Sequence, residues 1–385
     1  MRWNKRNIFK KVYWILCEKT LGIFRVLPIQ KNKIIFDNFG GRGYGCDPKY
    51  IAEELLRRKE KLDMVWLTNN PSDSFPKGIR TVKYGGIRAM YELATARVWV
   101  DNFKSGMKLR KRKSQYYIQT WHSSLGVKMN EADAENLTRS YVRKAKRDAA
   151  MTDLMYSNNA FRAEKYRHHY WYHGPVIRCG HPRNGILIQN SLQVEEKIRN
   201  YYGIEKEKKL LLYAPTFRQT LDTKENEHDI GRCLQALSER FGTTFVCLFR
   251  QHPNVDMTRD DVLAEDIIFA GDYPDMQELM AASDVLITDY SGCMFEFMLT
   301  GKPVFLFVQD LKSYMKKERK LYFTFEELPF PMAENDDMLC HNIRVFAQED
   351  YQRACERFIK LVKIEEDGKG AEKLSDIILE KIHEK

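Results

Sequence analysis

Residues 283–308 read SDVLITDYSGCMFEFMLTGKPVFLFV. The apolar run from Val285 to Thr288 predicts a buried strand, and a turn rich in hydroxyl groups follows it. A helix is expected from Cys293 to Thr300, and a second apolar strand from Val304 to Val308. Two strands joined by a helix indicate a βαβ unit, in which the strands are parallel members of one sheet.

The same alternation extends outward along the chain. Further strands are expected at 34–36, 64–67, 98–100, 115–118, 154–156, 176–178, 209–213, 244–249 and 266–269. Further helices are expected at 48–59, 87–95, 132–150, 229–240, 276–282, 350–363 and 370–383. Because 385 residues exceed what one compact core usually holds, we expect two domains. The predicted fold class is α/β, with two Rossmann-type domains whose parallel sheets face each other across a cleft.

A charged stretch at 195–208 interrupts the two series of strands and is the expected linker. The chain therefore divides into an N-terminal segment 1–31, a first domain 32–200 and a second domain 205–385 that includes the two closing helices. Parallel sheets bind ligands at the carboxyl ends of their strands. Both domains should therefore contribute side chains to one site.

The composition is that of a folded, basic protein. Lys and Arg number 63 against 53 Asp and Glu, which gives a formal net charge of +10. That excess favours anionic partners such as nucleotides, polyphosphates, acidic lipids or nucleic acid. The eight cysteines never form a C-x-x-C pair, which argues for a reducing compartment and against a disulfide framework or a zinc site.

The N-terminal segment combines an apolar stripe with basic residues. Ile8, Phe9, Val12 and Leu16 follow helical spacing, and two tryptophans and five Lys or Arg residues accompany them. This pattern is typical of an interfacial anchor on an anionic leaflet, although a helix packed on the first domain would look similar. No apolar run approaches the roughly 20 residues of a spanning helix, so we expect peripheral attachment.

Two histidines follow predicted strands. His122 comes after the strand 115–118, and His252 comes after the strand 244–249. A histidine near neutral pKa can act as a general base, although a structural histidine is the alternative for each position. Arg250 lies two residues before His252, so on an extended strand both side chains point the same way. The pair suits a diphosphate, and a plain basic surface pair is the alternative.

Hydroxyl groups gather at two further strand ends. Thr216 and Arg218 follow the strand 209–213 and suit phosphate binding, although an ordinary loop fits equally well. Thr288, Ser291 and Gly292 surround the next helix start, where free N–H groups and the helix dipole favour a phosphate. A capping serine is the alternative there. The remaining candidate is an acidic residue one turn into that helix, suited to ribose hydroxyls: Glu296.

Two other features remain open. The glycine-rich stretch 40–45 follows the first strand and is either a phosphate-cradling loop or a simple turn, since it lacks the full dinucleotide pattern. The five basic residues within 139–147 form either a solvated helix face or a surface for an anionic polymer or membrane.

These segments together resemble the CDP-glycerol glycerophosphotransferase family, the teichoic-acid-type polymerases and primases of bacteria. Each motif is weak alone, but five occur in the family's order between about Lys33 and Pro331. They are QTWHS at 119–123, GHPRNG at 180–185, YAPTFR at 213–218, RQHP at 250–253 and SDVLITDYSGCMFEF at 283–297.

The resemblance implies a GT-B-like fold, peripheral membrane attachment, CDP-glycerol as donor and transfer without a metal. It assigns His122 as the base for the acceptor hydroxyl, and His252 with Arg250 as stabilisers of the diphosphate and the leaving CMP. It also implies an acceptor-side first domain and a donor-binding second domain. The implied phosphate contacts are Thr216, Thr288 and Ser291, and the implied ribose contact is Glu296.

Three positions depart from the family pattern. Ser123 stands where the family has glycine, which bears on the acceptor side. Gly292 stands where the family has a second serine, so one phosphate hydroxyl is missing. Gly185 stands where the family has aspartate, which bears on contacts between the domains.

We therefore predict transfer of glycerol phosphate from CDP-glycerol to a hydroxyl of a cell-surface polymer, with release of CMP. The acceptor would be lipid-linked or polymeric, of the teichoic or capsular type, at the cytoplasmic face of the membrane. CDP-ribitol is the first alternative donor, and a GT-B sugar transferase is the second alternative. A non-catalytic module that binds anionic polymers is the alternative outside enzymes, and nucleic acid is not an expected partner.

Overall fold

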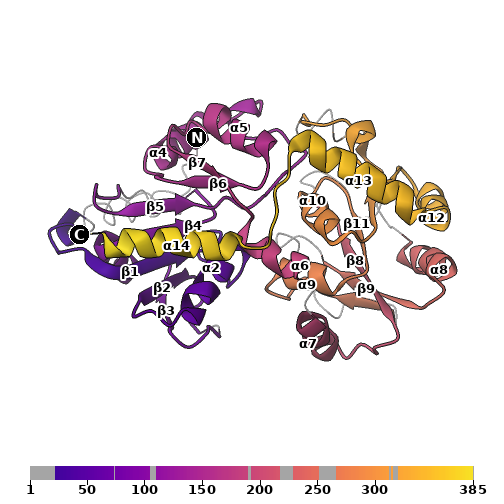
Figure 1. Ribbon diagram of the computed structural model, residues 1–385, viewed down its shortest axis with the longest axis horizontal. Coiled ribbons are helices and arrows are strands. Elements are labelled where there is room, and N and C mark those ends of the chain that lie inside the picture. The colour runs from indigo at the N-terminus through magenta and orange to yellow at the C-terminus, as the bar shows by residue number, and fades with distance from the viewer. Residues whose placement is uncertain are drawn as a thin grey trace, which may run out of the picture.

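The computed structural model describes residues 22–72, 74–104, 110–189, 192–216, 229–250, 266–311, 314 and 320–384. Three of the features expected above lie outside the described residues: Arg218, His252 and most of the N-terminal segment. The rest of the chain forms two lobes that lie side by side along the long axis of the molecule (Figure 1).

The N-terminal lobe is built on a parallel sheet with strand order β3-β2-β1-β4-β5. Alternate residues along its strands face opposite sides, so Phe36 and Trp66 lie in one core, and Ile35 and Val65 lie in another. A smaller parallel pair of strands, β6 and β7, continues beyond β5. The bounds are β1 Gln30–Asp37, β2 Asp63–Thr68, β3 Ile79–Lys83, β4 Ala96–Asp101, β5 Tyr116–Gln119, β6 Met155–Ser157 and β7 Val176–Arg178.

Helices cover both faces of the N-terminal sheets. They are α2 Cys46–Arg57, α3 Ile87–Thr95, α4 Arg139–Ala149 and α5 Ala160–His169, with short 3-10 helices η1 Glu131–Asp133 and η2 Pro182–Asn184. The helix expected at 132–150 is shorter, because Thr138 caps it by accepting a hydrogen bond from the N–H of Tyr141. The strand β3 was not predicted, since its apolar residues are too few to stand out.

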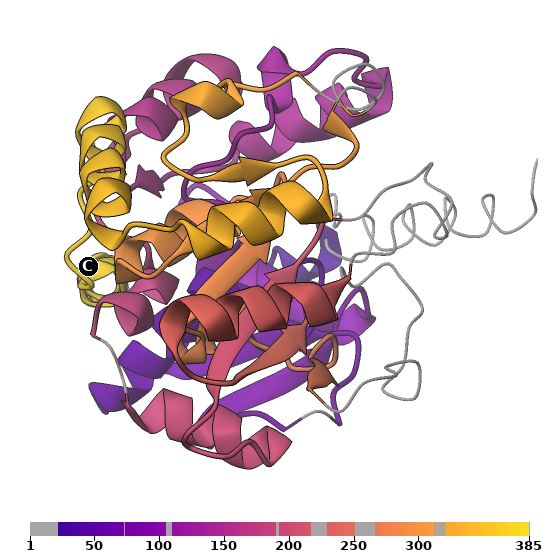
Figure 2. The same ribbon diagram turned by 90° about the vertical axis from the view of Figure 1, so that its right-hand side faces the viewer.

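The C-terminal lobe is built on a second parallel sheet, with strand order β10-β9-β8-β11-β12-β13. Figure 2 looks onto this lobe and shows helices lying in front of its strands. The strands are β8 Lys209–Ala214, β9 Phe245–Phe249, β10 Ile267–Phe269, β11 Val285–Thr288, β12 Val304–Phe307 and β13 Met332–Ala333. Its helices are α6 Gly185–Ile188, α7 Leu192–Tyr202, α8 Ile230–Phe241, α9 Met276–Ala282, α10 Cys293–Phe297, α12 Asp336–Arg344 and α13 Gln348–Val362, with 3-10 helices η5 Met298–Thr300 and η6 Phe325–Glu327. One more helix, α14 Gly370–His383, follows them in the chain.

Two parallel sheets with helices on their faces confirm the predicted α/β class, and the strands expected in the second half are present within one or two residues. Two segments, however, pack differently from the expected domain bounds. Ile198 of α7 lies in the core of the C-terminal lobe, so the stretch taken as a linker begins as a packed helix. The final helix α14 returns to the N-terminal lobe, where Leu374 and Ile378 pack in the core beside α2.

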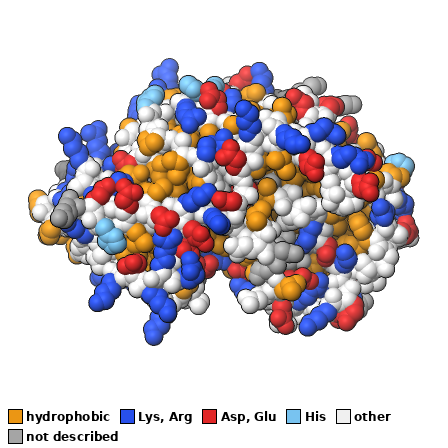
Figure 3. Space-filling model, viewed as in Figure 1, with side chains coloured by type: hydrophobic (Ala, Val, Ile, Leu, Met, Phe, Trp, Pro, Cys, Tyr) orange, Lys and Arg blue, Asp and Glu red, His pale blue; other side chains and the backbone are white. Residues whose placement is uncertain are grey.

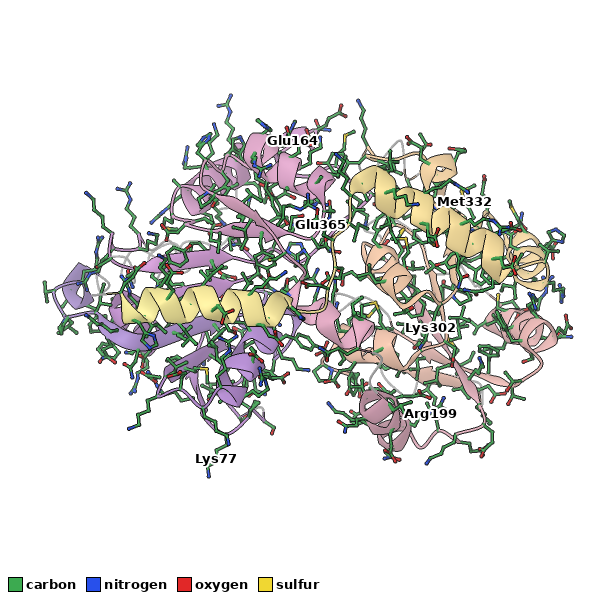
Figure 4. The ribbon with its side chains drawn as sticks, viewed as in Figure 1. Lys77, Glu164, Arg199, Lys302, Met332 and Glu365 are labelled. Atoms are coloured by element: carbon green, nitrogen blue, oxygen red, sulfur yellow. The ribbon has the colours of Figure 1, made fainter. Side chains whose placement is uncertain are left out.

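Within the described residues, the chain passes from one lobe to the other near α6 and returns before α14, and this second crossing is held by polar contacts. Glu365 lies on this crossing segment (Figure 4), and its N–H donates to the carbonyl oxygen of Asn158 at 2.6 Å. The carboxylate of Glu366 accepts from Asn158 Nδ2, from the N–H of His181 and from Asn184 Nδ2, each at 3.0 Å. Both crossings thus meet at one polar junction between the lobes.

Candidate active site between the two lobes

His122 follows β5 at the face where the two lobes meet. The preceding residue, Trp121, has a left-handed backbone with φ of 56°, which turns the chain sharply at the strand end. The Nδ1 atom of His122 lies 3.1 Å from the carbonyl oxygen of Asn102. Because a carbonyl can only accept, Nδ1 carries the proton and Nε2 keeps its lone pair. The loop therefore presents Nε2 as a base.

Aromatic rings surround the His122 imidazole. Its ring centroid lies 4.4 Å from that of Trp121, 5.3 Å from that of Phe39 and 6.3 Å from that of Phe103. Burial lowers the pKa of His122 from 6.5 to about 4, and the positive charge of Arg183 acts in the same direction. The side chain is therefore neutral near pH 7, which is the form that accepts a proton.

Asn102 was not singled out from the sequence, yet it holds the partner atom of His122. Its side-chain oxygen accepts from the N–H of Phe39 at 2.8 Å, and its Nδ2 donates to Asn38 Oδ1 at 2.6 Å. The only signal in the sequence was its position directly after a strand.

The glycine-rich loop at 40–45 has a structural role in this arrangement. The N–H of Gly41, a position with φ of 84°, donates to the buried Asp37 carboxylate at 2.7 Å. Burial raises the pKa of Asp37 to about 7. The carbonyl oxygen of Arg42 in the same loop accepts from Asn38 Nδ2 at 2.8 Å, so the loop supports Asn38. A phosphate-cradling role for the loop stays untested.

Two of the expected phosphate-binding hydroxyls are bonded within the C-terminal lobe. Thr288 is fully buried, and its Oγ1 donates to the carbonyl oxygen of Ala214 at 2.7 Å. Thr216 donates from both its N–H and its Oγ1 to the carboxylate of Asp289 at 3.0 Å. Asp289, which was not proposed as a site residue, therefore fixes the turn after β8.

Arg250 lies at the end of β9. Its Nη1 donates to the carbonyl oxygens of Ala270 at 3.0 Å and Tyr273 at 2.6 Å. Burial lowers the pKa of the guanidinium, and the nearby Asp275 carboxylate opposes that shift. These bonds fix the position of Arg250 against the loop that follows β10.

Glu296 makes a buried ion pair between the lobes. Its carboxylate, from α10, accepts from Arg183 Nη2 at 2.6 Å and from Arg183 Nε at 3.1 Å. It also accepts from Gln277 Nε2 at 2.7 Å and from Ser124 Oγ at 3.0 Å. Both carboxylate oxygens therefore have protein donors in this conformation, and the ribose contact expected for Glu296 stays a prediction.

Arg183 extends this network to α2. Its Nη1 donates to Asp47 Oδ2 at 2.5 Å, and the Nδ1 of the buried His181 lies 2.9 Å from the same oxygen. Burial alone would raise the pKa of Asp47, but Arg183 and His181 hold it below its ordinary value. The departure at Gly185 has a steric reason, because a Cβ there would lie 2.9 Å from the carbonyl oxygen of Gly368 on the second crossing.

The structure brings the loop after His122 directly against the start of α10. A Cβ atom on Gly292 would lie 2.7 Å from the carbonyl oxygen of Leu125. Beside it, Ser291 Oγ accepts from the N–H of Cys293 at 3.4 Å. The described part of the chain holds no group of three or more His, Cys, Asp and Glu side chains placed to bind a metal, and transfer without a metal stays a prediction.

Comparison with known proteins gives a consistent result. The chain is 29% identical over 343 residues to the teichoic acid poly(glycerol phosphate) polymerase of Bacillus subtilis (strain 168), covering 85% of this chain and 45% of that protein. It is also 29% identical to the teichoic acid ribitol-phosphate primase of Bacillus spizizenii (strain ATCC 23059 / NRRL B-14472 / W23), covering 92% of each protein.

Among solved structures, the wall teichoic acid polymerase TagF superimposes with a TM-score of 0.85 at 25% identity, covering 99% of this chain and 98% of that one. The chain spans about half the length of the Bacillus subtilis relative. The family model for CDP-glycerol:poly(glycerophosphate) glycerophosphotransferase matches residues 20–380, nearly the whole chain. The motifs, the two-lobed fold and this match agree, and the chain belongs to the CDP-glycerol:poly(glycerophosphate) glycerophosphotransferase family.

Proposed function

We propose that this protein transfers a glycerol-phosphate unit from CDP-glycerol to a hydroxyl of a teichoic-acid-like acceptor and releases CMP. The observation that carries this proposal is His122, which presents a neutral Nε2 where its loop meets the start of α10. Membership of the family and the fold shared with TagF support the donor.

In this reaction, His122 Nε2 accepts the proton of the acceptor hydroxyl. The acceptor oxygen attacks the β-phosphorus of CDP-glycerol, and the bond from that phosphorus to the bridging oxygen breaks. The electron pair leaves with CMP, and a phosphodiester remains. Arg250 and Ser291 supply positive charge and hydrogen-bond donors to the diphosphate, so that positioning and electrostatic stabilisation lower the barrier.

CDP-ribitol is the second candidate donor. The observation that favours it is the ribitol-phosphate primase, which is as similar in sequence as the glycerol phosphate polymerase. A sugar transferase and a non-catalytic polymer-binding module fit the family membership less well.

A purified-protein assay with CDP-glycerol, CDP-ribitol and UDP-glucose in parallel separates these functions. Release of CMP from CDP-glycerol, dependent on an added acceptor, supports the proposal. Release of CMP from CDP-ribitol alone would show that CDP-ribitol is the donor. Release of UDP from UDP-glucose would show that the protein is a sugar transferase.

The acceptor in this proposal is lipid-linked or polymeric, and the protein works at the cytoplasmic face of an anionic membrane. The exposed face of α4 supports this placement, because it presents Arg139, Arg143, Lys144 and Lys146. Figure 3 shows many Lys and Arg side chains along the outer edge of the N-terminal lobe. None of the described helices has the length and apolar character needed to cross a bilayer.

Vesicle sedimentation tests this placement. Binding to vesicles that contain phosphatidylglycerol should fall with added salt, and it should weaken when Arg143 and Lys144 are both changed to Glu. Equal binding to neutral vesicles would show that electrostatic attraction does not hold the protein on the membrane.

A further inference from the structure

The loop that carries His122 belongs to both lobes. It leaves β5 of the N-terminal sheet, but Leu125 and Val127 are buried in the core of the C-terminal lobe. The N–H of Tyr322 donates to the carbonyl oxygen of Val127 at 2.7 Å, and the N–H of Met129 donates to that of Lys320 at 2.8 Å. The position of His122 therefore depends on how residues 123–125 dock on the C-terminal lobe.

Ser123 and Gly292 meet at this docking point. Ser123 Oγ donates to the carbonyl oxygen of Leu125 at 2.6 Å, which closes a tight turn directly after His122. A Cβ on Gly292 would lie 2.9 Å from Ser123 Oγ and 2.7 Å from that same carbonyl oxygen. Because the second of these atoms is backbone, a side chain at 292 displaces the turn and cannot simply swing aside.

We propose that Ser123 and Gly292 are a matched positioning pair, in which the absent side chain at 292 admits the Ser123–Leu125 turn onto the start of α10 and so sets the place of His122 relative to the donor. These are also two of the positions at which the chain departs from the family pattern. In this chain the loop supplies a hydroxyl, from Ser123, and the start of α10 leaves room for the loop, because Gly292 has no side chain.

The Leu125 carbonyl oxygen lies beside both positions, because it accepts from Ser123 Oγ and would lie 2.7 Å from a Cβ at position 292. With glycine at 123 and serine at 292, the hydroxyl of residue 292 is placed to donate to this carbonyl oxygen, and the flexible glycine lets the turn yield to the new Cβ. With serine at both positions, the turn is pushed away from α10. The two residues should therefore be coupled, and the effect of changing one should depend on the identity of the other.

The inference rests on the proposed function, because displacement of His122 is read through the rate of transfer. The experiment compares the parent protein with Ser123→Gly, Gly292→Ser and the double variant, and measures kcat and KM for CDP-glycerol from CMP release. Gly292→Ser should lower kcat by about tenfold to a hundredfold, as expected for a reacting group moved by about 1 Å. Its KM should change little, since Arg250 and Ser291 keep their places.

Ser123→Gly alone should lower kcat by less than about tenfold, the effect of one lost neutral hydrogen bond. The double variant should have a higher kcat than Gly292→Ser. Gly231→Ser, in the first turn of α8 with its nearest contact at 3.4 Å, is the matched control and should keep the parent kinetics.

Additive losses in the double variant would overturn the proposal, as would parental kcat in Gly292→Ser. If the parent protein releases no CMP, the proposed function fails, and the same four proteins are then compared by thermal unfolding. A double variant that melts above Gly292→Ser would uphold the pair as a steric contact. Additive changes in melting temperature would overturn it independently of catalysis.

Discussion

The strand ends of the two lobes present different chemistry to the interface between them. Around His122, the N-terminal lobe places the rings of Phe39, Phe103 and Trp121, with the Asn38–Asn102 amide pair behind them. The C-terminal lobe places Arg250, Ser291 and the Thr216–Asp289 pair at the ends of its strands. Aromatic rings surround the histidine on one side, and hydrogen-bonded polar groups line the other.

This difference follows from what each side has to do in the proposed reaction. A base must stay neutral until it takes a proton, and apolar surroundings disfavour the charged imidazole. A diphosphate carries negative charge, so its side needs cations and N–H or O–H donors. The surroundings of His122 therefore suit the base, and those of Arg250 suit the leaving group.

The largest expected effect is that of His122→Ala, which tests the role of the histidine as the base. Loss of a general base typically lowers the rate by about 10²–10⁴-fold, and CMP release should fall by that factor. His168→Ala, on an exposed histidine of α5, is the matched control. A melting temperature like that of the parent must accompany the loss, and a rate within a few-fold of the parent would place the base elsewhere.

The second test concerns the Arg183–Glu296 ion pair, one of those that join the two lobes. Glu296→Gln leaves the buried Arg183 with one carboxylate partner fewer, and broken buried pairs cost about 3–5 kcal/mol of stability. Thermal or denaturant unfolding measures this cost. Glu239→Gln breaks an exposed pair with Arg344 and should leave the melting temperature close to that of the parent. A raised KM for the donor with unchanged stability would instead support the ribose contact.

On the polar side, Arg250→Ala should raise the KM for CDP-glycerol. A hydrogen bond to a charged group contributes about 1.5–3 kcal/mol, which corresponds to roughly a tenfold to hundredfold loss in kcat/KM. Arg250→Lys should recover part of the loss, because it restores the charge without the planar geometry. Kinetics that change only toward the acceptor would show that the donor binds elsewhere.

A smaller effect separates two hydroxyls of the same lobe. Thr288→Val removes a buried bond to the Ala214 carbonyl, so it should cost about 1 kcal/mol of stability and leave donor kinetics unchanged. Ser291→Ala should do the reverse, weakening the donor without lowering the melting temperature. The same steady-state assay and melting curve read both variants.

The smallest expected effect concerns pH, since kcat/KM should stay constant across the ordinary titration range of histidine. Because burial holds the pKa of His122 at about 4, kcat/KM should show no acid limb near the ordinary value of 6.5. The sign for stability follows from the same shift. The unfolded chain binds a proton below pH 6.5 that the folded chain does not, so this contribution is complete above 6.5 and is lost as the pH falls toward 4. A limb near 6.5 would mean that His122 is hydrated.

Much of the fold was readable from the sequence, because strand and helix patterns are local. The alternation along 283–308 gave β11, α10 and β12 in the observed order, and it placed Ser291 and Gly292 at a helix start. The position of His122 after β5 was readable for the same reason. The amphipathic stripe of α14 was equally plain, but a stripe fits either sheet, so its return to the N-terminal lobe was not predictable.

The side-chain partners were decided by the tertiary structure alone. The sequence by itself determined the types of element, the parallel sheets and the strand ends where chemistry is found, since these depend on backbone hydrogen bonding and short-range periodicity. Arg183 and Glu296 lie 113 residues apart, and no pattern in either segment indicates that burial pairs them. The same holds for Thr288 with Ala214 and for His122 with Asn102. A buried polar group must find a partner, and only the packing of distant segments determines which one it finds.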